Sequence, residues 1–267
     1  MNILVVDTNA IEQELIDLCL KSKHLDHIYT ASTISLDKIP NIEYEDFSDL
    51  AHKAKLLQID LVLVANKELI QNGIVEILRK NMLNVISVNQ KWFNLESSRL
   101  IAKQLMNHYS INNPLVLKAP ISFPIVIKTD EPHTTKIAHS MNELVKIREE
   151  LSGIEVFLEE FLTGDIYYLL SLWDGKNLLN FPLSCTLTEV QQDRLELYKT
   201  KLNFMFSDEN ANFIGFFISK LIWAKNDWHI IEYIMHLNKT AELKLIKSDF
   251  LTILNSAIYQ KLDEIRL

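Results

Sequence analysis

Glycine is scarce in this chain. Only five of its 267 residues are glycine, whereas average usage of about 7% would give nearly four times as many. Glycine lets backbone amides come close to phosphate groups, so loops that bind nucleotides are usually rich in it. The shortage counts against a nucleotide site built on a glycine-rich loop.

Cysteine and positive charge are also scarce. Cys19 and Cys185 lie far apart in the sequence and form no metal or redox motif, so we expect two buried thiols in a reducing compartment. The formal net charge is -8, and no basic stripe of the kind that contacts nucleic acid is present. These features exclude an ordinary nucleic-acid-binding protein.

Long apolar runs are missing too. The N-terminal run is short and follows no basic segment, unlike a signal peptide, and no stretch approaches the roughly 20 apolar residues that cross a bilayer. Apolar residues nevertheless make up 48% of the chain, which is enough for a packed core. We therefore predict a soluble, cytoplasmic protein of about two modest domains without membrane contact.

The first 90 residues alternate between short apolar runs and helical patterns. Such alternation predicts crossover connections and a parallel sheet, and hence a small open α/β domain. Expected strands are Ile3–Val6, His27–Thr30, Asp60–Ala65 and Asn84–Val88, and expected helices are Ala10–Lys21, Phe47–Leu57 and Lys67–Lys80.

The remaining residues predict an α+β arrangement with mainly antiparallel strands. The turn signals Thr163-Gly164-Asp165 and Asp174-Gly175-Lys176 separate short apolar runs, and Leu187–Phe206 is ambiguous with helix-like spacing. Expected strands are Ile125–Lys128, Glu155–Leu162, Tyr167–Trp173, Phe213–Ala224 and His229–Ile234, and expected helices are Leu95–His108, Met141–Leu151 and Asp249–Leu262.

Several motifs occur in the order found in one enzyme family. They are Met1-Asn2-Ile3-Leu4-Val5-Val6, Ile59-Asp60-Leu61-Val62-Leu63-Val64, Leu95-Glu96-Ser97-Ser98-Arg99, Pro124-Ile125-Val126-Ile127-Lys128, Glu159-Glu160-Phe161-Leu162-Thr163-Gly164-Asp165 and Ile230-Ile231-Glu232-Tyr233. Through these motifs the chain resembles the phosphoribosylamine–glycine ligases of purine synthesis, which belong to the ATP-grasp superfamily.

The resemblance implies an architecture. Residues 1–92 correspond to a Rossmann-like pre-ATP-grasp domain, and residues 93–267 to a reduced ATP-grasp domain with mainly antiparallel sheets. Within the second domain we expect a small lobe at about 115–162, followed by the remainder at 163–267. Because the chain stops near Leu267, we expect the C-terminal domain of the family to be absent.

The resemblance also implies ATP-dependent joining of a carboxylate to an amine, with ATP and Mg²⁺ as cofactors. It places Arg99, Lys128 and Lys136 at the phosphates as cations. It makes Glu160, Phe161 and Leu162 the adenine hinge, Asp165 a ribose contact and Glu232 a Mg²⁺ ligand. Each residue also has an ordinary structural alternative. The cations can be solvated surface bases, Asp165 can be a turn residue, and Glu232 can be an inward-facing carboxylate that needs a partner within the protein.

Departures from the family pattern bear on activity. The glycine loop of the family is replaced by Asp7–Gln13. Its phosphate flap is replaced by Thr129–Ile137, without the three glycines, and a metal-ligating asparagine by Ile234. These changes imply that ligase activity is weakened or lost.

Two functions therefore remain open: a divergent ligase acting on ATP and on glycine or a phosphoribosyl compound, or a catalytically inactive pseudoenzyme that binds a nucleotide or a protein partner. An unrelated α/β interaction protein is a third reading. The first two require the basic groups, the hinge and Glu232 to converge on one crevice between sheets.

Overall fold

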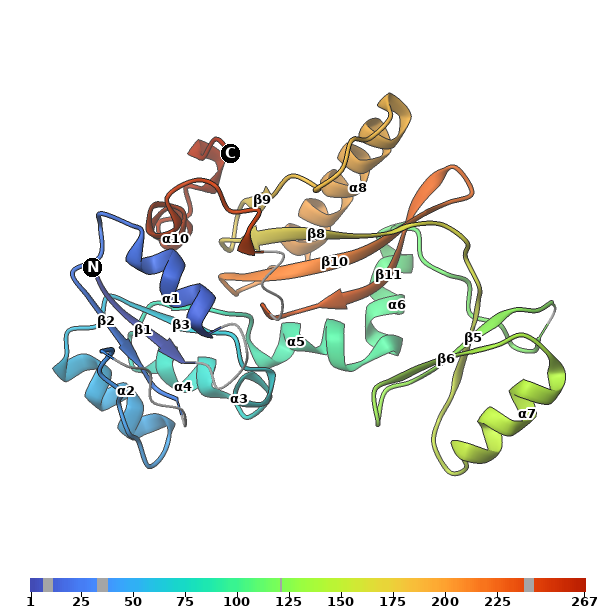
Figure 1. Ribbon diagram of the computed structural model, residues 1–267, viewed down its shortest axis with the longest axis horizontal. Helices are drawn as coiled ribbons and strands as arrows, with labels where there is room; N and C mark the ends of the chain where they lie inside the picture. Colours follow the sequence, from blue (N-terminus) through green and yellow to red (C-terminus); the bar gives the residue numbers. More distant parts are fainter. Residues whose placement is uncertain (7–11, 33–37, 121, 238–242) are drawn as a thin grey trace.

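The computed structural model describes residues 1–6, 12–32, 38–120, 122–237 and 243–267. This part of the chain contains one parallel and two antiparallel β-sheets (Figure 1). The predicted open α/β domain followed by an α+β part with mainly antiparallel strands is confirmed. Residues 7–11 of the segment that replaces the glycine loop lie outside the described residues.

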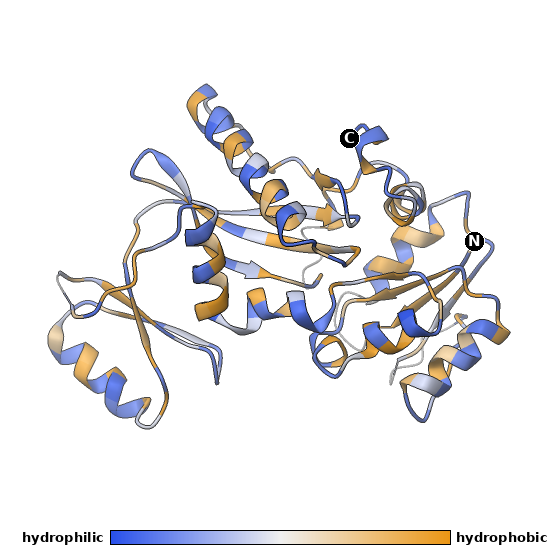
Figure 2. Ribbon diagram, turned by 180° about the vertical axis from the view of Figure 1, so that it is seen from behind, coloured by the Kyte–Doolittle hydropathy of each residue, from blue (hydrophilic) through white to orange (hydrophobic). Residues whose placement is uncertain are grey.

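The parallel sheet occupies the N-terminal part of the chain. Its strand order is β2-β1-β3-β4, and every neighbouring pair is parallel. Side chains of β1 alternate between two apolar clusters, one shared with α2 and α4 and the other with α1, so helices cover both faces (Figure 2). The elements are β1 Asn2–Val6, α1 Glu12–Leu20, β2 His27–Thr30, α2 Phe47–Leu56, β3 Leu61–Val64, α3 Lys67–Gln71, α4 Ile74–Lys80 and β4 Val85–Ile86.

Two predicted helices are each broken in two. The helix expected over Lys67–Lys80 is interrupted at Gly73, whose φ of 84° is left-handed and unsuitable for helix continuation. The helix expected over Leu95–His108 is instead α5 Gln90–Ser97 and α6 Arg99–His108. Ser98 between them is extended, and its side chain accepts a hydrogen bond from the Ile101 N–H and thus caps α6.

The two antiparallel sheets form the rest of the chain. The small lobe is the sheet β6-β5-β7 with helix α7, and the large sheet has the order β11-β10-β8-β9. Residue 93, where the second domain was expected to begin, lies inside α5. The elements are β5 Ile125–Thr129, β6 Thr134–Ala138, α7 Met141–Glu150, β7 Phe157–Glu160, β8 Ile166–Trp173, β9 Leu178–Asn180, α8 Glu189–Asp208, β10 Gly215–Ala224, β11 Asp227–Ile234, α10 Phe250–Ile258 and the 3₁₀ helix η1 Leu262–Glu264.

Some local features differ from the sequence-based expectation, and one ambiguous segment is resolved. The segment expected to be a phosphate flap contains strand β6, and β9 had not been predicted. The ambiguous segment is the 20-residue helix α8, which begins with a reciprocal capping box between Thr188 and Gln191. Cys19 is buried as expected, but Cys185 is exposed. Within the described residues, no helix is both long and apolar enough to cross a membrane.

The parallel sheet and the large sheet share their core. Each of the two large apolar clusters contains residues of both sheets: Leu4 and Trp173 belong to one, and Ile3 and Phe216 to the other. The small lobe has its own cluster, which packs under α7. The small lobe is therefore joined to the rest of the molecule mainly by polar contacts, and these converge on the candidate site.

A close backbone contact joins the parallel sheet to the large sheet. The Ser87 N–H donates a 2.7 Å hydrogen bond to the Ile214 carbonyl, and Gly215 follows directly. A Cβ atom at Gly215 would lie 2.6 Å from the Ser87 carbonyl carbon and 2.8 Å from the Val88 nitrogen. The junction therefore requires a residue without a side chain at this position.

We predict that Gly215→Ala lowers the free energy of unfolding by an amount near the upper end of roughly 1–3 kcal/mol, because backbone atoms cannot rotate away from the added methyl group. Urea unfolding measures the change. Gly153→Ala is the control: no atom lies within 4 Å of a Cβ added there, but its φ is +81°, so it should cost only about 1 kcal/mol. A smaller loss at Gly215 than at Gly153 would contradict the close contact.

Candidate functional site

A crevice lies where the small lobe, helices α5 and α6 and strand β11 meet. We use "crevice" for the space lined by Leu95, Glu96, Arg99, Ala102, Lys103, Met106, Lys128, Glu159, Ile231, Glu232 and Tyr233. Three of these, Arg99, Lys128 and Glu232, are site residues predicted from the sequence. The structure thus brings one predicted cation from α6, one from β5 and the predicted acid from β11 to the same place.

Glu159 binds two lysines at the inner end of the crevice. Its side chain is 1% exposed, and its two carboxylate oxygens lie 3.0 Å from Lys103 Nζ and 2.9 Å from Lys128 Nζ. Lys103 also donates to the Pro114 carbonyl and to Asn113 Oδ1. Burial lowers the pKa of Lys128, and the Glu159 carboxylate opposes that shift. The predicted phosphate-binding lysine, Lys128, thus already has a counter-charge within the protein, the Glu159 carboxylate.

A β-bulge in the large sheet gives Lys128 a second contact. Lys220 pairs with Glu232 but Leu221 pairs with Ile230, so Ile231 is the extra residue on β11. Bulges free backbone groups from the ladder, and the Ile231 carbonyl accepts a 3.0 Å hydrogen bond from Lys128 Nζ. The irregularity of β11 therefore ties the small lobe to the large sheet.

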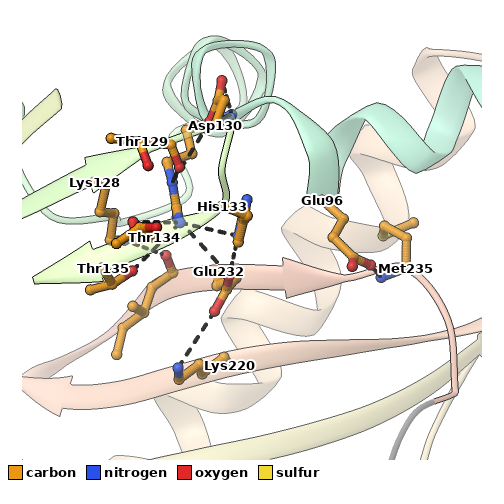
Figure 3. Close-up of polar contacts among 12 residues, drawn as sticks. Glu96, Lys128, Thr129, Asp130, His133, Thr134, Thr135, Lys220, Glu232 and Met235 are labelled. Carbon is orange, nitrogen blue, oxygen red and sulfur yellow. Dashed lines mark hydrogen bonds and ion pairs between the residues drawn. The ribbon is translucent and has the colours of Figure 1, made fainter. Parts of the chain in front are cut away.

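Glu232 lies among positively charged and hydrogen-bonding groups at the outer end of the crevice (Figure 3). One carboxylate oxygen is 2.8 Å from His133 Nε2 and 4.0 Å from Arg99 Nη1, and the other is 3.4 Å from Lys220 Nζ. Although burial raises its pKa, His133, Lys220 and Arg99 together outweigh burial and lower the pKa of Glu232 from 4.5 to about 2. The carboxylate is held ionised by its own chain.

Arg99 links this group to the small lobe. Its side chain is 7% exposed, donates to the Thr129 carbonyl and lies 3.7 Å from an Asp130 oxygen. Its backbone N–H also donates to the Asp130 carboxylate at 3.0 Å. Burial lowers the pKa of Arg99, and Glu232 is the carboxylate that most opposes the shift. Arg99 and Asp130 both belong to the predicted site motifs but contact each other.

The crevice has almost no free volume. The cavity measures about 20 Å³, which has room for one water molecule, whereas small-molecule sites usually measure about 300–1,000 Å³. Its side chains therefore contact each other in place of a ligand.

The predicted hinge lies beside the crevice and does not line it. Glu160 of β7 pairs with Lys225 in the β10–β11 turn and accepts a 3.1 Å hydrogen bond from the Leu115 N–H. Phe161 and Leu162 are half-buried, and Asp165 is exposed in the loop before β8. The residue before the predicted hinge, Glu159, does line the crevice and had not been predicted as a site residue.

Lys136 is not brought to the crevice. It lies opposite Ile127 on neighbouring strands, and Ile127 belongs to the apolar cluster under α7. Its ammonium group pairs with Glu150 of α7. Lys128 is one position removed from Ile127 and therefore points to the other face of the small sheet. The prediction that both lysines contact the same phosphates does not agree with this geometry.

Sequence reasoning missed four residues of the site: Lys103, His133, Glu159 and Lys220. Lys103 falls four positions after Arg99, so a helical reading places both on one face of α6. Lys220 interrupts an apolar strand, and a charged residue in such a strand needs a partner. His133 gave no signal beyond its position in the turn after β5.

The residues present do not fit Mg²⁺. This ion takes about six oxygen ligands in octahedral geometry, but the crevice offers Glu232 with Lys220, Arg99 and His133 already beside it. No group of three or more His, Cys, Asp or Glu residues able to hold a metal occurs in the described part of the chain. ATP does not fit this closed arrangement either, because Lys128 is paired and the cavity is small.

Larger hollows lie elsewhere, and several of their polar groups have structural roles. A hollow of about 570 Å³ beside α1 includes Asp249, which caps α10 and accepts from Ser22. Another of about 580 Å³ includes Asp174, whose carboxylate accepts hydrogen bonds from three backbone N–H groups, and Arg79, which donates to two carbonyls. The residues that were predicted from the sequence and that converge, Arg99, Lys128 and Glu232, meet in the crevice.

Comparison with known proteins supports the resemblance predicted from the motifs. Residues 1–96 match the family model described as phosphoribosylglycinamide synthetase, N domain. A phosphoribosylamine–glycine ligase from Fusobacterium nucleatum is 25% identical over 321 aligned positions, which cover 100% of this chain and 75% of the relative. The predicted similarity to this family is confirmed.

Solved structures support the fold. The crystal structure of phosphoribosylamine–glycine ligase from Thermotoga maritima has a TM-score of 0.77 at 17% identity, covering 97% of this chain and 76% of that protein. A D-alanine–D-alanine ligase from Bacillus anthracis, solved in complex with ATP, has a TM-score of 0.66 at 17% identity, covering 99% of this chain and 100% of that protein.

We predict that Glu159→Gln destabilises the protein by roughly 3–5 kcal/mol, because it leaves two lysines at a nearly fully buried position without a counter-charge. Chemical denaturation measures the loss. Glu160→Gln is the matched control on the neighbouring residue. Its partner Lys225 is 56% exposed, so the expected cost is below about 1 kcal/mol. Equal losses in the two variants would refute the assigned role of Glu159.

Acid should remove the stabilisation that Glu232 provides. Its pKa is about 2 in the folded protein and 4.5 without its neighbours, so the stabilisation is complete above about pH 4.5 and is lost as the pH falls towards 2. It amounts to at most on the order of 3 kcal/mol. Unfolding free energies measured between pH 5 and pH 2 should therefore fall more steeply in the wild type than in Glu232→Gln; parallel curves would contradict the lowered pKa.

Proposed function

We propose that this relative of the phosphoribosylamine–glycine ligases keeps the ATP-grasp fold as a binding module and has weakened or lost ATP-dependent joining of a carboxylate to an amine. One observation carries the proposal: the side chains expected to contact ATP and its metal ion already form ion pairs and hydrogen bonds with other side chains of the protein. Lys128 is bound by Glu159, and Glu232 by His133, Lys220 and Arg99.

The chemistry of the reaction makes these pairings costly for catalysis. Forming and using an acyl phosphate needs unpaired cations or metal ions at the transferred phosphoryl group, held in position before the reaction. A nucleotide entering the crevice must first separate Lys128 from Glu159, a pair that is almost completely buried. Separating a buried pair costs several kcal/mol, so we expect ATP to bind feebly.

The same contacts support a role in binding. They fix the small lobe against the large sheet: Lys128 donates to the Ile231 carbonyl, His133 contacts the Glu232 carboxylate, and Arg99 contacts both Glu232 and the Thr129 carbonyl. The module thus presents a rigid, closed arrangement. A protein partner can bind to this closed arrangement directly, whereas a nucleotide requires the crevice to open.

A divergent but active ligase is the second candidate. The observation in its favour is the similarity over the whole chain to a phosphoribosylamine–glycine ligase, together with the placement of Lys128 and Glu232 in one crevice. In that case ATP, glycine and a phosphoribosyl compound are the substrates, and the lobes must open for turnover.

An assay of ADP and phosphate release separates the two candidates. The protein is incubated with ATP, Mg²⁺, glycine and phosphoribosylamine, and we expect no release above that of a protein-free control. We expect calorimetry with ATP to show binding no tighter than about the millimolar range, because the free energy needed to open the crevice is subtracted from the free energy of binding.

Release of ADP that depends on both glycine and phosphoribosylamine would establish the ligase instead. Micromolar ATP affinity that is lost in Lys128→Ala would show that the nucleotide site is intact. Lys136→Ala is the control for the second measurement, because Lys136 lies on the α7 side of the small sheet.

A further inference from the structure

Among the contacts of Glu232 described above, Lys220 is the one basic group that belongs to the large sheet. It comes from β10 and lies directly opposite Glu232 of β11 in the strand register. Directly paired residues on neighbouring strands point to the same face of the sheet. The Nζ atom is 3.4 Å from the Glu232 carboxylate, and the two side chains are 25% and 21% exposed.

The position of this ammonium group disfavours a metal ion at Glu232. A divalent cation beside Glu232 would have to share the carboxylate with a positive charge already in contact with it. Arg99 lies against the other oxygen, so neither side of the carboxylate is free of a positive charge. Like charges this close repel each other strongly in a partly buried site.

The charge balance of the crevice points the same way. Four basic side chains, Arg99, Lys103, Lys128 and Lys220, face four carboxylates, Glu96, Asp130, Glu159 and Glu232. Each of these carboxylates already has a partner in the protein, since Glu96 accepts from the Met235 N–H and lies 2.9 Å from His236. A further cation is therefore disfavoured here.

We propose that Lys220 takes the place of the divalent cation beside Glu232, so that the crevice excludes Mg²⁺ and Mn²⁺ and accepts only ligands that arrive without a metal ion. Any ligand that enters when the crevice opens must therefore bind without a divalent metal ion. This inference deepens the proposed function and rests on it, because a ligase of the usual kind needs the metal that Lys220 displaces.

The experiment is a Mn²⁺ titration followed by the relaxation of water protons, which reports protein-bound Mn²⁺. We expect no specific site in the wild type. Lys220→Asp places a second carboxylate opposite Glu232 and removes the repelling charge, so its Mn²⁺ affinity should exceed that of the wild type by about tenfold or more. Lys220→Met removes the charge without adding a ligand and should gain much less.

The double variant Lys220→Asp with Glu232→Gln locates the effect: the gained site must disappear in it. A specific Mn²⁺ site in the wild type that is lost in Glu232→Gln would overturn the proposal, and this result needs no variant at position 220. A Lys220→Asp protein that folds but binds no more Mn²⁺ than the wild type would overturn it as well.

The Mn²⁺ titration tests this inference separately from the proposed function, which the assay of ADP and phosphate release tests. Absence of ligation together with a wild-type Mn²⁺ site at Glu232 would remove this inference alone. Metal-dependent ligation together with such a site would remove both.

Discussion

The interaction on which the site depends is the enclosure of one carboxylate, Glu232, by groups from three directions. His133 reaches it from the turn after β5, Arg99 from α6 and Lys220 from β10. Since the small lobe has a separate apolar core, these polar contacts and the hydrogen bond from Lys128 to the Ile231 carbonyl hold it against the large sheet. A single acidic side chain is thereby both the predicted metal ligand and the attachment point of a lobe, and it cannot serve both purposes at once.

Much of the fold could be predicted from the sequence because its signals are local. The apolar runs of β1 and β3 are buried on both faces and read as continuous strands. The breaks at Gly73 and Ser98 were missed because the apolar spacing continues across them, and only the backbone conformation reveals the interruption. Strand β6 was missed because its residues occupy the position of a glycine-rich flap in the related enzymes.

The site was predicted less completely, for reasons of geometry. The meeting of Arg99, Lys128 and Glu232 could be predicted because their motifs follow one another in the same order as in the enzymes that the chain resembles. The face on which Lys136 lies depends on its register with β5, which the sequence did not give. Likewise the bulge at Ile231, which frees a carbonyl for Lys128, and the pairing of Lys220 with Glu232 arise only from the alignment of β10 with β11.

The state of one carboxyl group decides whether the crevice is closed to metal, and it can be observed directly. Glutamate labelled with ¹³C at the side-chain carboxyl allows the titration of Glu232 to be followed by NMR, with Glu232→Gln identifying the signal. We expect a pKa of about 2 and a signal that Mg²⁺ does not shift at neutral pH. A pKa near 4.5, or a signal that moves on addition of Mg²⁺, would contradict the enclosure of Glu232 and the exclusion of metal from the crevice.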